Sequence, residues 1–228
     1  MRNIVTRMAL SLKQFGLYGT YLKVHAILSD PLFDIKYGTD TGKIIDLKNL
    51  TIKSPNIKYG IRYQPTKVIY LRKFLQQIKA IIPAKPVLVD FGCGKGRVLL
   101  IASEYGFNEL RGIEFSHELC EIAKINIDIF RSRNKTDAVF RIIESDVTKY
   151  SVQSDENVFF MFNPFSETVM EQALNNISTS LKEWPRKILI IYVNPIEDKF
   201  IDSFDGIRKV RKYLYGYPFV VYTNYFVE

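Results

Sequence analysis

The chain of 228 residues is poor in the residues that most often build hydrolase, metal and disulfide sites. Cys93 and Cys120 are its only cysteines and form no C-x-x-C pair, which argues against disulfide scaffolding and zinc binding and favours a reducing cytoplasm. His25 and His117 are its only histidines, and the chain has neither an H-E-x-x-H spacing nor a G-x-S-x-G serine. We therefore expect neither histidine-based hydrolysis nor a required metal.

The chain also lacks a long apolar run, since no stretch approaches the ~18 consecutive apolar residues of a membrane span. It begins with Arg2 and Arg7 among apolar residues, but Lys13 and Gln14 interrupt the run and no small-residue cleavage site follows. We expect neither a signal peptide nor stable insertion into a membrane, and we predict a cytoplasmic location.

Four apolar residues of this first segment share one helical face: Ile4, Met8, Leu12 and Phe15. Two interpretations are open. The face packs on the rest of the domain, or it forms a basic amphipathic helix on a membrane surface. Packing on the domain is the commoner arrangement, and it is the one we predict.

Lys and Arg exceed Asp and Glu by 32 to 24, which gives a net charge of +8. This excess allows an acidic partner, namely nucleic acid, an anionic membrane surface or an acidic protein. It fits equally well a basic enzyme with scattered charges. The densest cluster alternates with apolar residues as one solvated strand face would: Arg208, Lys209, Arg211 and Lys212.

Residues 1–60 lack the alternation of strands and helices that the rest of the chain shows. A helical start is followed by Pro31, a turn-rich segment at 37–42 and two expected short strands at 43–47 and 50–52. We interpret residues 1–60 as an N-terminal extension or lid and residues 61–228 as the main domain.

From Tyr63 onward, short apolar strands alternate with amphipathic helices. A helix is predicted to begin near Pro65, with one apolar face made of Val68, Leu71, Leu75 and Ile78. Strands are expected at 87–91, 110–115, 139–143, 158–162 and 188–193, with helices at 98–104, after the N-cap Ser116, and at 166–181. This alternation predicts right-handed βαβ units and a mainly parallel sheet.

The end of the chain differs because no helix fits between its last two strands. Segments 210–215 and 219–226 are joined only by Gly216-Tyr217-Pro218, so they are predicted to pair as an antiparallel hairpin. The predicted fold class is therefore α/β, with five parallel strands, a C-terminal antiparallel hairpin and an N-terminal extension.

A glycine-rich bend, Val89 to Arg97, follows the first predicted strand, where an open α/β sheet binds its ligands. Gly92, Gly94 and Gly96 let the backbone turn tightly and approach a ligand. Their spacing is G-x-G-x-G rather than the dinucleotide pattern G-x-G-x-x-G. Asp90 lies just before them, and a carboxylate there would repel a pyrophosphate but attract the α-ammonium of an amino acid. The bend therefore favours a ligand with a cationic methionyl tail.

Acidic residues also follow the next two predicted strands. Glu114 comes 22 residues after Gly92, a spacing that lets a carboxylate accept both hydroxyls of a ribose. Asp146 follows the third strand, where it can meet the amine of an adenine while Val147 packs on the ring. One such residue alone is commonly a helix cap or a solvated loop residue, but three in order after three strands indicate a binding site.

Asp90-Phe91-Gly92-Cys93-Gly94-Lys95-Gly96, Gly112-Ile113-Glu114 and Asp146 resemble the successive motifs of class I, seven-strand methyltransferases that depend on S-adenosylmethionine (SAM). The resemblance runs from about Tyr63 to the C-terminus and leaves residues 1–60 uncovered. It implies a doubly wound, Rossmann-like sheet and SAM as the cofactor. By this resemblance, Asp90 with the backbone of Gly92 and Gly94 holds the methionyl part, Glu114 the ribose, and Asp146 with Val147 the adenine; Cys93 and Gly96 belong to the same cofactor-binding bend.

Asn163-Pro164-Phe165 closes the fourth predicted strand, beside the expected cofactor. It resembles the [D/N]-P-P-[F/Y] motif of methyltransferases that act on planar or amide nitrogens, but it lacks the second proline, which leaves the target open. Asn163 and the Pro164 carbonyl are placed to accept N–H hydrogen bonds, and Phe165 to stack on a substrate or contact a cation. The alternative is an Asn-Pro turn that merely ends a strand.

Tyr63-Gln64-Pro65-Thr66 resembles the Tyr-x-Pro-[Ser/Thr] element of small seven-strand protein-lysine methyltransferases. In that family the element covers the cofactor and the lysine channel, which makes Tyr63 and Thr66 candidates here. The alternative is a packed tyrosine and a helix cap. A dry aromatic mouth would lower the pKa of a lysine amine from its usual ~10.4, and the candidates for it are Tyr63, Phe162, Phe165 and Tyr192.

Three functions remain open. The preferred one is SAM-dependent methyl transfer to a nitrogen nucleophile, a protein lysine, with a protein as the expected partner. The second is a methyltransferase for a nucleic-acid base or a small molecule; the net charge favours nucleic acid, but no stripe of clustered basic and aromatic residues accompanies it. The third is a catalytically silent SAM-binding protein, and the intact glycines and carboxylates argue against it.

Overall fold

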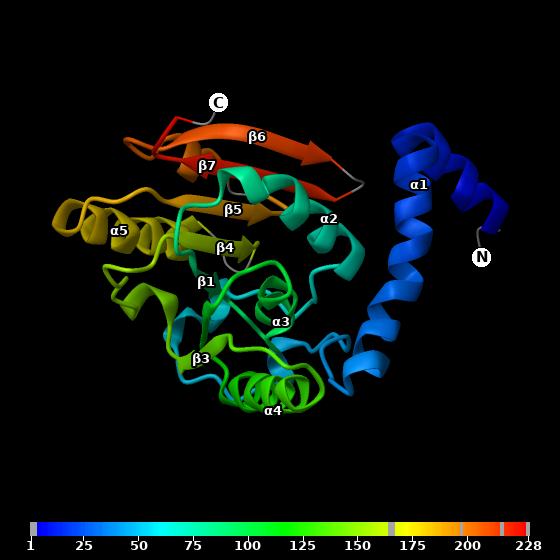
Figure 1. The fold of residues 1–228 in the computed structure, drawn as a ribbon, viewed down its shortest axis with the longest axis horizontal. Helices are drawn as coiled ribbons and strands as arrows, with labels where there is room; N and C mark the ends of the chain where they lie inside the picture. The colour runs from blue at the N-terminus through cyan, green and yellow to red at the C-terminus, as the bar shows by residue number, and fades with distance from the viewer. Residues whose placement is uncertain (1–3, 164–166, 197, 215–216, 227–228) are drawn as a thin grey trace.

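The computed structural model describes residues 4–163, 167–196, 198–214 and 217–226, and its centre is one seven-stranded sheet (Figure 1). The strands lie in the order β3-β2-β1-β4-β5-β7-β6. Their bounds are β1 Val87–Phe91, β2 Glu109–Glu114, β3 Val139–Glu144, β4 Val158–Phe162, β5 Leu189–Val193, β6 Arg208–Leu214 and β7 Pro218–Thr223.

Strands β1 to β5 run parallel to one another, and β7 lies antiparallel to both β5 and β6. The predicted mainly parallel, doubly wound sheet with a C-terminal antiparallel hairpin is thereby confirmed. Of the expected turn of this hairpin, Gly216 lies outside the described residues. Because parallel strand ends meet at one edge, the segments that follow β1, β2, β3 and β4 are brought together there.

Helices cover both faces of the sheet, so successive strand residues enter two different cores. One core joins the sheet to α1 Ile4–Tyr37, α2 Val68–Ile78, α3 Arg97–Ser103 and α4 His117–Arg133. The other joins it to α5 Glu167–Glu183 and α6 Asp198–Asp202. In β1, Leu88 belongs to the first core, whereas Val89 and Phe91 belong to the second. The strand is buried throughout, as its continuous apolar sequence predicts.

Helix α2 begins later than the predicted start at Pro65 because a distant residue sets its first turn. The Asp30 side chain, from α1, accepts a hydrogen bond of 2.9 Å from the Val68 amide and one of 2.7 Å from the Lys67 ammonium. The carboxylate thus satisfies a free amide at the N-terminus of the helix. The predicted apolar face is confirmed, since Val68, Leu71, Leu75 and Ile78 are all buried.

The prediction of two short strands at 43–47 and 50–52 is wrong. The segment contains only an isolated bridge between Ile45 and Tyr63, followed by the 3₁₀ turns η1 Leu47–Asn49 and η2 Pro55–Tyr59. Pairing stops after that single bridge, so the backbone turns locally instead.

Helix α1 is longer than its sequence indicates and changes direction once. It continues through Pro31 to Tyr37, where Phe33 and Tyr37 anchor its last turns in the core. Its backbone leaves helical geometry at Gly16, where φ is 66° and ψ is −176°. The arm before Gly16 turns away from the sheet at the right of Figure 1.

The prediction that Ile4, Met8, Leu12 and Phe15 pack on the domain is wrong for Leu12, which is 39% exposed. The side chains of Ile4 and Met8 lie outside the described set. The helix packs through Leu22, Ala26, Phe33 and Tyr37, all on the arm after Gly16. None of the helices in the described ranges is long and apolar enough to cross a bilayer.

Candidate active site

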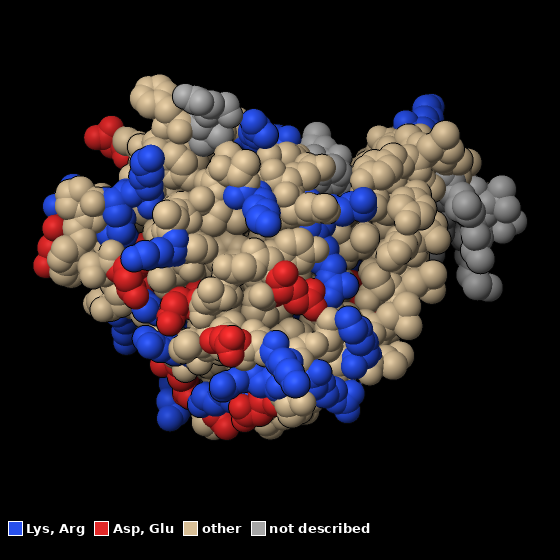
Figure 2. All heavy atoms as spheres, viewed as in Figure 1, with Lys and Arg blue, Asp and Glu red and all other residues tan. Residues whose placement is uncertain are grey.

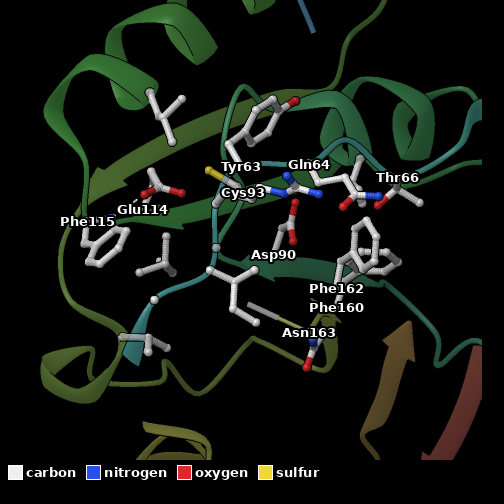
Figure 3. A pocket seen from close by; sticks show the side chains of 18 of the residues that line it. Tyr63, Gln64, Thr66, Asp90, Cys93, Glu114, Phe115, Phe160, Phe162 and Asn163 are labelled. Atoms are coloured by element: carbon white, nitrogen blue, oxygen red, sulfur yellow. Dashed lines mark hydrogen bonds between the residues drawn. The ribbon is translucent and has the colours of Figure 1, made fainter. Parts of the chain in front are cut away.

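A pocket opens at the carboxyl edge of the sheet, above the ends of β1, β2 and β4 (Figure 3). The glycine-rich bend lines it at the centre, with residues that follow β3 on one side and the end of β4 on the other. Residues 56–66, from the segment before α2, close it from a third side. The sequence-predicted residues that line it are Tyr63, Thr66, Asp90, Gly92, Cys93, Glu114, Asp146, Val147 and Asn163. Gly94 and Gly96 shape the bend without lining the pocket.

The bend is tied to the neighbouring strand by its own backbone. The amides of Gly92 and Cys93 donate to the Ile113 carbonyl over 2.9 and 3.1 Å. Gly92, Gly94 and Gly96 all have positive φ angles, 79°, 53° and 82°. These angles are costly for residues with a Cβ atom, so the three glycines allow the chain to turn from β1 into α3 within six residues.

Tyr63 lies directly over the bend (Figure 3). A Cβ atom on Gly94 would come within 2.2 Å of the Tyr63 ring, so the ring occupies the space a side chain would need. The phenol donates a 2.7 Å hydrogen bond to the Thr41 carbonyl. Burial is the main reason why the pKa of Tyr63 lies far above its usual value, and the residue stays a neutral phenol.

We expect Gly94→Ala to abolish ligand binding in this pocket, because the new methyl group meets both the left-handed backbone and the Tyr63 ring. Gly106→Ala is the matched control, since Gly106 has φ +88° but nothing within 4 Å of the new atom. Thermal melting and SAM titration of both variants separate backbone strain from steric blockage. Equal SAM affinity in the two variants would contradict the role given to this contact.

Asp90 is a buried carboxylate that faces the pocket. It is 2% exposed, and it accepts no hydrogen bond from any residue the structure describes. Burial raises its pKa well above the usual value, and the nearby Glu114 carboxylate raises it further. An unpaired acid in such a place gains most from a cationic group of a ligand.

Glu114 is also buried, but its carboxylate already has partners. It accepts hydrogen bonds from the amides of Gly94, Phe115 and Ser116 over 2.9, 2.9 and 3.0 Å. Burial raises its pKa, while these three amides oppose the shift. A carboxylate has about four acceptor positions, so Glu114 ties the bend to β2 and keeps room for about one further donor.

The Asp146 side chain is more fully occupied than the sequence suggests. It accepts hydrogen bonds from the Ser54 hydroxyl, from the Asn56 amide over 2.8 Å, and from the Thr148 amide and hydroxyl over 2.9 and 2.8 Å. Burial would raise its pKa, but these donors outweigh burial and lower it. In this arrangement the carboxylate has no open position for an adenine amine, and its partner Asn56 also lines the pocket.

Asn163 stands at the opposite end of the pocket, just beyond β4. Its backbone is left-handed, with φ 37°, and its Oδ1 atom accepts a 3.2 Å hydrogen bond from the Tyr192 hydroxyl. Phe162 lines the pocket, whereas Tyr192 is fully buried behind Asn163. Pro164 and Phe165, the other two residues of the predicted motif, lie outside the described residues.

Sequence reasoning missed Arg97, the last residue of the bend. Its guanidinium is 2% exposed and donates to the Thr41 hydroxyl over 2.7 Å and to the Thr66 carbonyl over 3.4 Å. It also pairs with Asp34 at 3.3 Å and with Asp30 at 3.4 Å. The bend is therefore fastened to residues 30–41 as well as to the sheet. A basic residue directly after three glycines was the available signal.

Comparisons with known proteins support the resemblance stated above. No protein-family profile matches the chain. A ribosomal protein L11 methyltransferase of Thermotoga neapolitana is 25% identical over 120 residues, which cover 47% of this chain and 43% of the relative. One of Cupriavidus metallidurans is 26% identical over 91 residues, which cover 40% of this chain and 27% of the relative. The matched segment spans less than half the length of these relatives.

Three solved structures share the fold. A candidate methyltransferase of Escherichia coli has a TM-score of 0.53 at 18% identity, covering 68% of this chain and 85% of that one. A variant of MtNAS in complex with SAM has a TM-score of 0.51 at 16% identity, covering 67% and 60%. A ribosomal protein L11 methylase of Lactobacillus delbrueckii subsp. bulgaricus has a TM-score of 0.50 at 12% identity, covering 70% and 79%.

The order of the strands, the terminal antiparallel hairpin and the acidic residue ahead of the glycine-rich bend all agree with these similarities. The chain therefore has the fold found in class I, seven-strand SAM-dependent methyltransferases.

Proposed function

We propose that the chain is a SAM-dependent methyltransferase that acts on a nitrogen nucleophile. The observation that carries this proposal is the buried Asp90 carboxylate, which accepts no hydrogen bond from the described residues and lies in the same pocket as Asn163. A carboxylate so placed suits the α-ammonium of SAM, and Asn163 suits the acceptor. A pyrophosphate cofactor would instead meet a negative charge beside the bend.

The residues of the pocket fit SAM in three parts. Asp90 and the Gly92 backbone would hold the methionyl end, the remaining acceptor position of Glu114 would take a ribose hydroxyl, and Val147 would pack on the adenine. Because the Asp146 carboxylate is filled, the amide oxygen of Asn56 is the better placed acceptor for the adenine amine. When bound, SAM supplies an electrophilic methyl group on a sulfonium leaving group.

The protein's own task is to orient the acceptor nitrogen and keep its lone pair free. The Asn163 amide oxygen can accept an N–H hydrogen bond from the acceptor, and the Tyr192 hydroxyl fixes the orientation of that amide. Phe160 and Phe162 contribute aromatic surface that excludes water from this end of the pocket, and Tyr63 adds a ring over the glycine-rich bend. Exclusion of water favours the neutral form of an amine.

A protein lysine is the acceptor that we propose. Two observations support it: the Tyr63 and Thr66 element lines the pocket, and the relatives found by sequence are named as ribosomal protein L11 methyltransferases. The proposed division of the chain places this element at the junction of the extension, residues 1–60, and the main domain, residues 61–228.

Incubation of the purified chain with methyl-labelled SAM and a cell lysate tests this proposal. We expect label in protease-sensitive material and in the methyl-lysine fraction after hydrolysis. Label in nucleic acid or in small metabolites would replace the proposed acceptor with one of those classes. SAM binding without transfer to any fraction would show a silent binder.

For Asn163 we expect Asn163→Gly to lower turnover about a hundredfold, the size of a lost positioning hydrogen bond in a transition state, with SAM affinity unchanged. Glycine accepts the left-handed backbone, so this variant tests the side chain without added strain. Asn163→Ala adds the strain and should fall lower still. Wild-type turnover in the glycine variant would mean that the Asn163 side chain has no role in catalysis and that only the backbone geometry matters at this position.

A further inference from the structure

Helix α1 carries large apolar side chains on two opposite faces. One face is buried against the domain through Leu22, Ala26, Phe33 and Tyr37. The other, here called the outer face of α1, points to solvent, and its residues are 55% to 81% exposed: Leu17, Tyr21, Ile27, Leu28, Leu32 and Ile35. A helix that is apolar all round is normally buried on all sides. The outer face of α1 is instead left exposed by the described part of the chain.

The first 29 residues of the sequence carry charges of one sign. Residues 1–29 contain four basic residues, Arg2, Arg7, Lys13 and Lys23, and no Asp or Glu. The first two acidic residues of α1 turn inward: Asp30 pairs with Lys67 at 2.7 Å, and Asp34 pairs with the buried Arg97 at 3.3 Å. The outer face is left without a carboxylate. Figure 2 shows α1, at the right, as an almost uncharged surface. On the rest of the visible face, basic and acidic side chains are scattered.

We propose that the outer face of α1 binds the surface of an anionic lipid bilayer. Its apolar side chains would enter the interface while the basic residues of the first 29 meet the lipid phosphates. Tyr18 and Tyr21, both more than half exposed, suit the level of the headgroups. The stretch from Leu17 to Ile35 is roughly 28 Å long as a helix, and it would lie in the plane of the membrane.

Charge complementarity favours this occupant over a second copy of the chain. Two copies joined through this face would bring together two N-terminal segments, residues 1–29, that each carry four basic and no acidic residues. An anionic bilayer offers the opposite charge over the whole length of the helix. The bend at Gly16 spreads the surface further, since the arm before it also exposes apolar groups, with Leu10 49% exposed.

Flotation of the full chain with lipid vesicles tests the proposal independently of any methyl transfer. We expect binding to vesicles of phosphatidylcholine mixed with phosphatidylglycerol, much weaker binding to phosphatidylcholine alone, and a decline as salt is raised. The triple variant Leu17→Glu, Leu28→Glu, Ile35→Glu should bind the mixed vesicles at least about tenfold more weakly. Ile125→Glu, at a residue 57% exposed on α4, is the matched control and should bind like the wild type.

Circular dichroism and thermal melting establish that the variants are folded, and a Lys13→Gln, Lys23→Gln variant tests the charges without touching the apolar face. Equal binding of the folded triple variant and the wild type would overturn the proposal, as would equal binding to both kinds of vesicle. A dimer in sedimentation velocity that the triple variant splits, without vesicle binding, would assign the face to a second copy instead.

Discussion

Replacement of Asp90 by Asn is expected to weaken SAM binding by about thirtyfold or more while making the free protein more stable. The variant keeps the shape of the side chain but cannot ionise, whereas burial and the Glu114 carboxylate raise the pKa of Asp90 and make its charged form costly in the free protein. Loss of one partner of a desolvated ion pair typically costs 2–5 kcal/mol of binding, whereas relief of an unpaired charge at a functional site commonly adds about 1 kcal/mol of stability. Isothermal titration and thermal melting measure the two effects.

Asp128→Asn, at an exposed carboxylate on α4, is the control and should change neither quantity appreciably. The dependence on pH gives a second check with a definite sign. Since the pKa of Asp90 is higher in the folded chain, the folded chain retains a proton that the unfolded chain has lost. The free energy of unfolding should fall as pH rises from the ordinary carboxyl pKa through the raised one, while SAM affinity should rise. Unchanged SAM binding by Asp90→Asn would remove Asp90 from the site.

Arg97→Ala is expected to lower the free energy of unfolding by about 3–5 kcal/mol, the usual cost of removing one partner of a buried ion pair. The guanidinium is 2% exposed and pairs with Asp30 and Asp34, so its loss leaves the mostly buried Asp34 carboxylate without a cation and Asp30 with Lys67 alone. Urea unfolding measures the loss. Arg72→Ala is the matched control: its pair with Glu104 is also short, at 2.7 Å, but lies at the surface, where such pairs are worth about 0–1 kcal/mol.

A companion variant distinguishes lost charge from lost packing. Arg97→Met combined with Asp34→Asn removes both members of one buried pair and leaves Asp30 paired with Lys67, so it should recover part of the stability that Arg97→Ala loses. Equal losses for Arg97→Ala and Arg72→Ala would contradict the view that this cluster fastens residues 30–41 to the glycine-rich bend.

The parts of the fold that the sequence predicts well are those set by local pattern. The strand Val87–Phe91 and the strand Val158–Phe162 match their predicted bounds because each is a short apolar run that ends at a turn residue. Ser116 acts as the predicted N-cap, and its hydroxyl accepts from the Leu119 amide. In the site, the glycine-rich bend and three acidic residues converge on one pocket, as their positions after successive strands imply.

The parts that sequence reasoning missed depend on residues far apart in the chain. Ser54 and Asn56 fill the Asp146 carboxylate from about ninety positions away, and Asp30 sets the start of α2 from thirty-eight positions away. No local periodicity encodes such contacts. The exposed outer face of α1 has a related cause: a run of apolar residues indicates burial, but it does not reveal which side the domain leaves uncovered.

A crystal of the chain grown with SAM, or with its demethylated product, tests the central claim most directly. We predict the ligand in the pocket between the glycine-rich bend and Asn163, with its α-ammonium within hydrogen-bonding distance of Asp90 and its sulfur end toward Asn163. A ligand found elsewhere, or one in the pocket with its amino-acid end away from Asp90, would contradict the proposed site and the methyl transfer built on it.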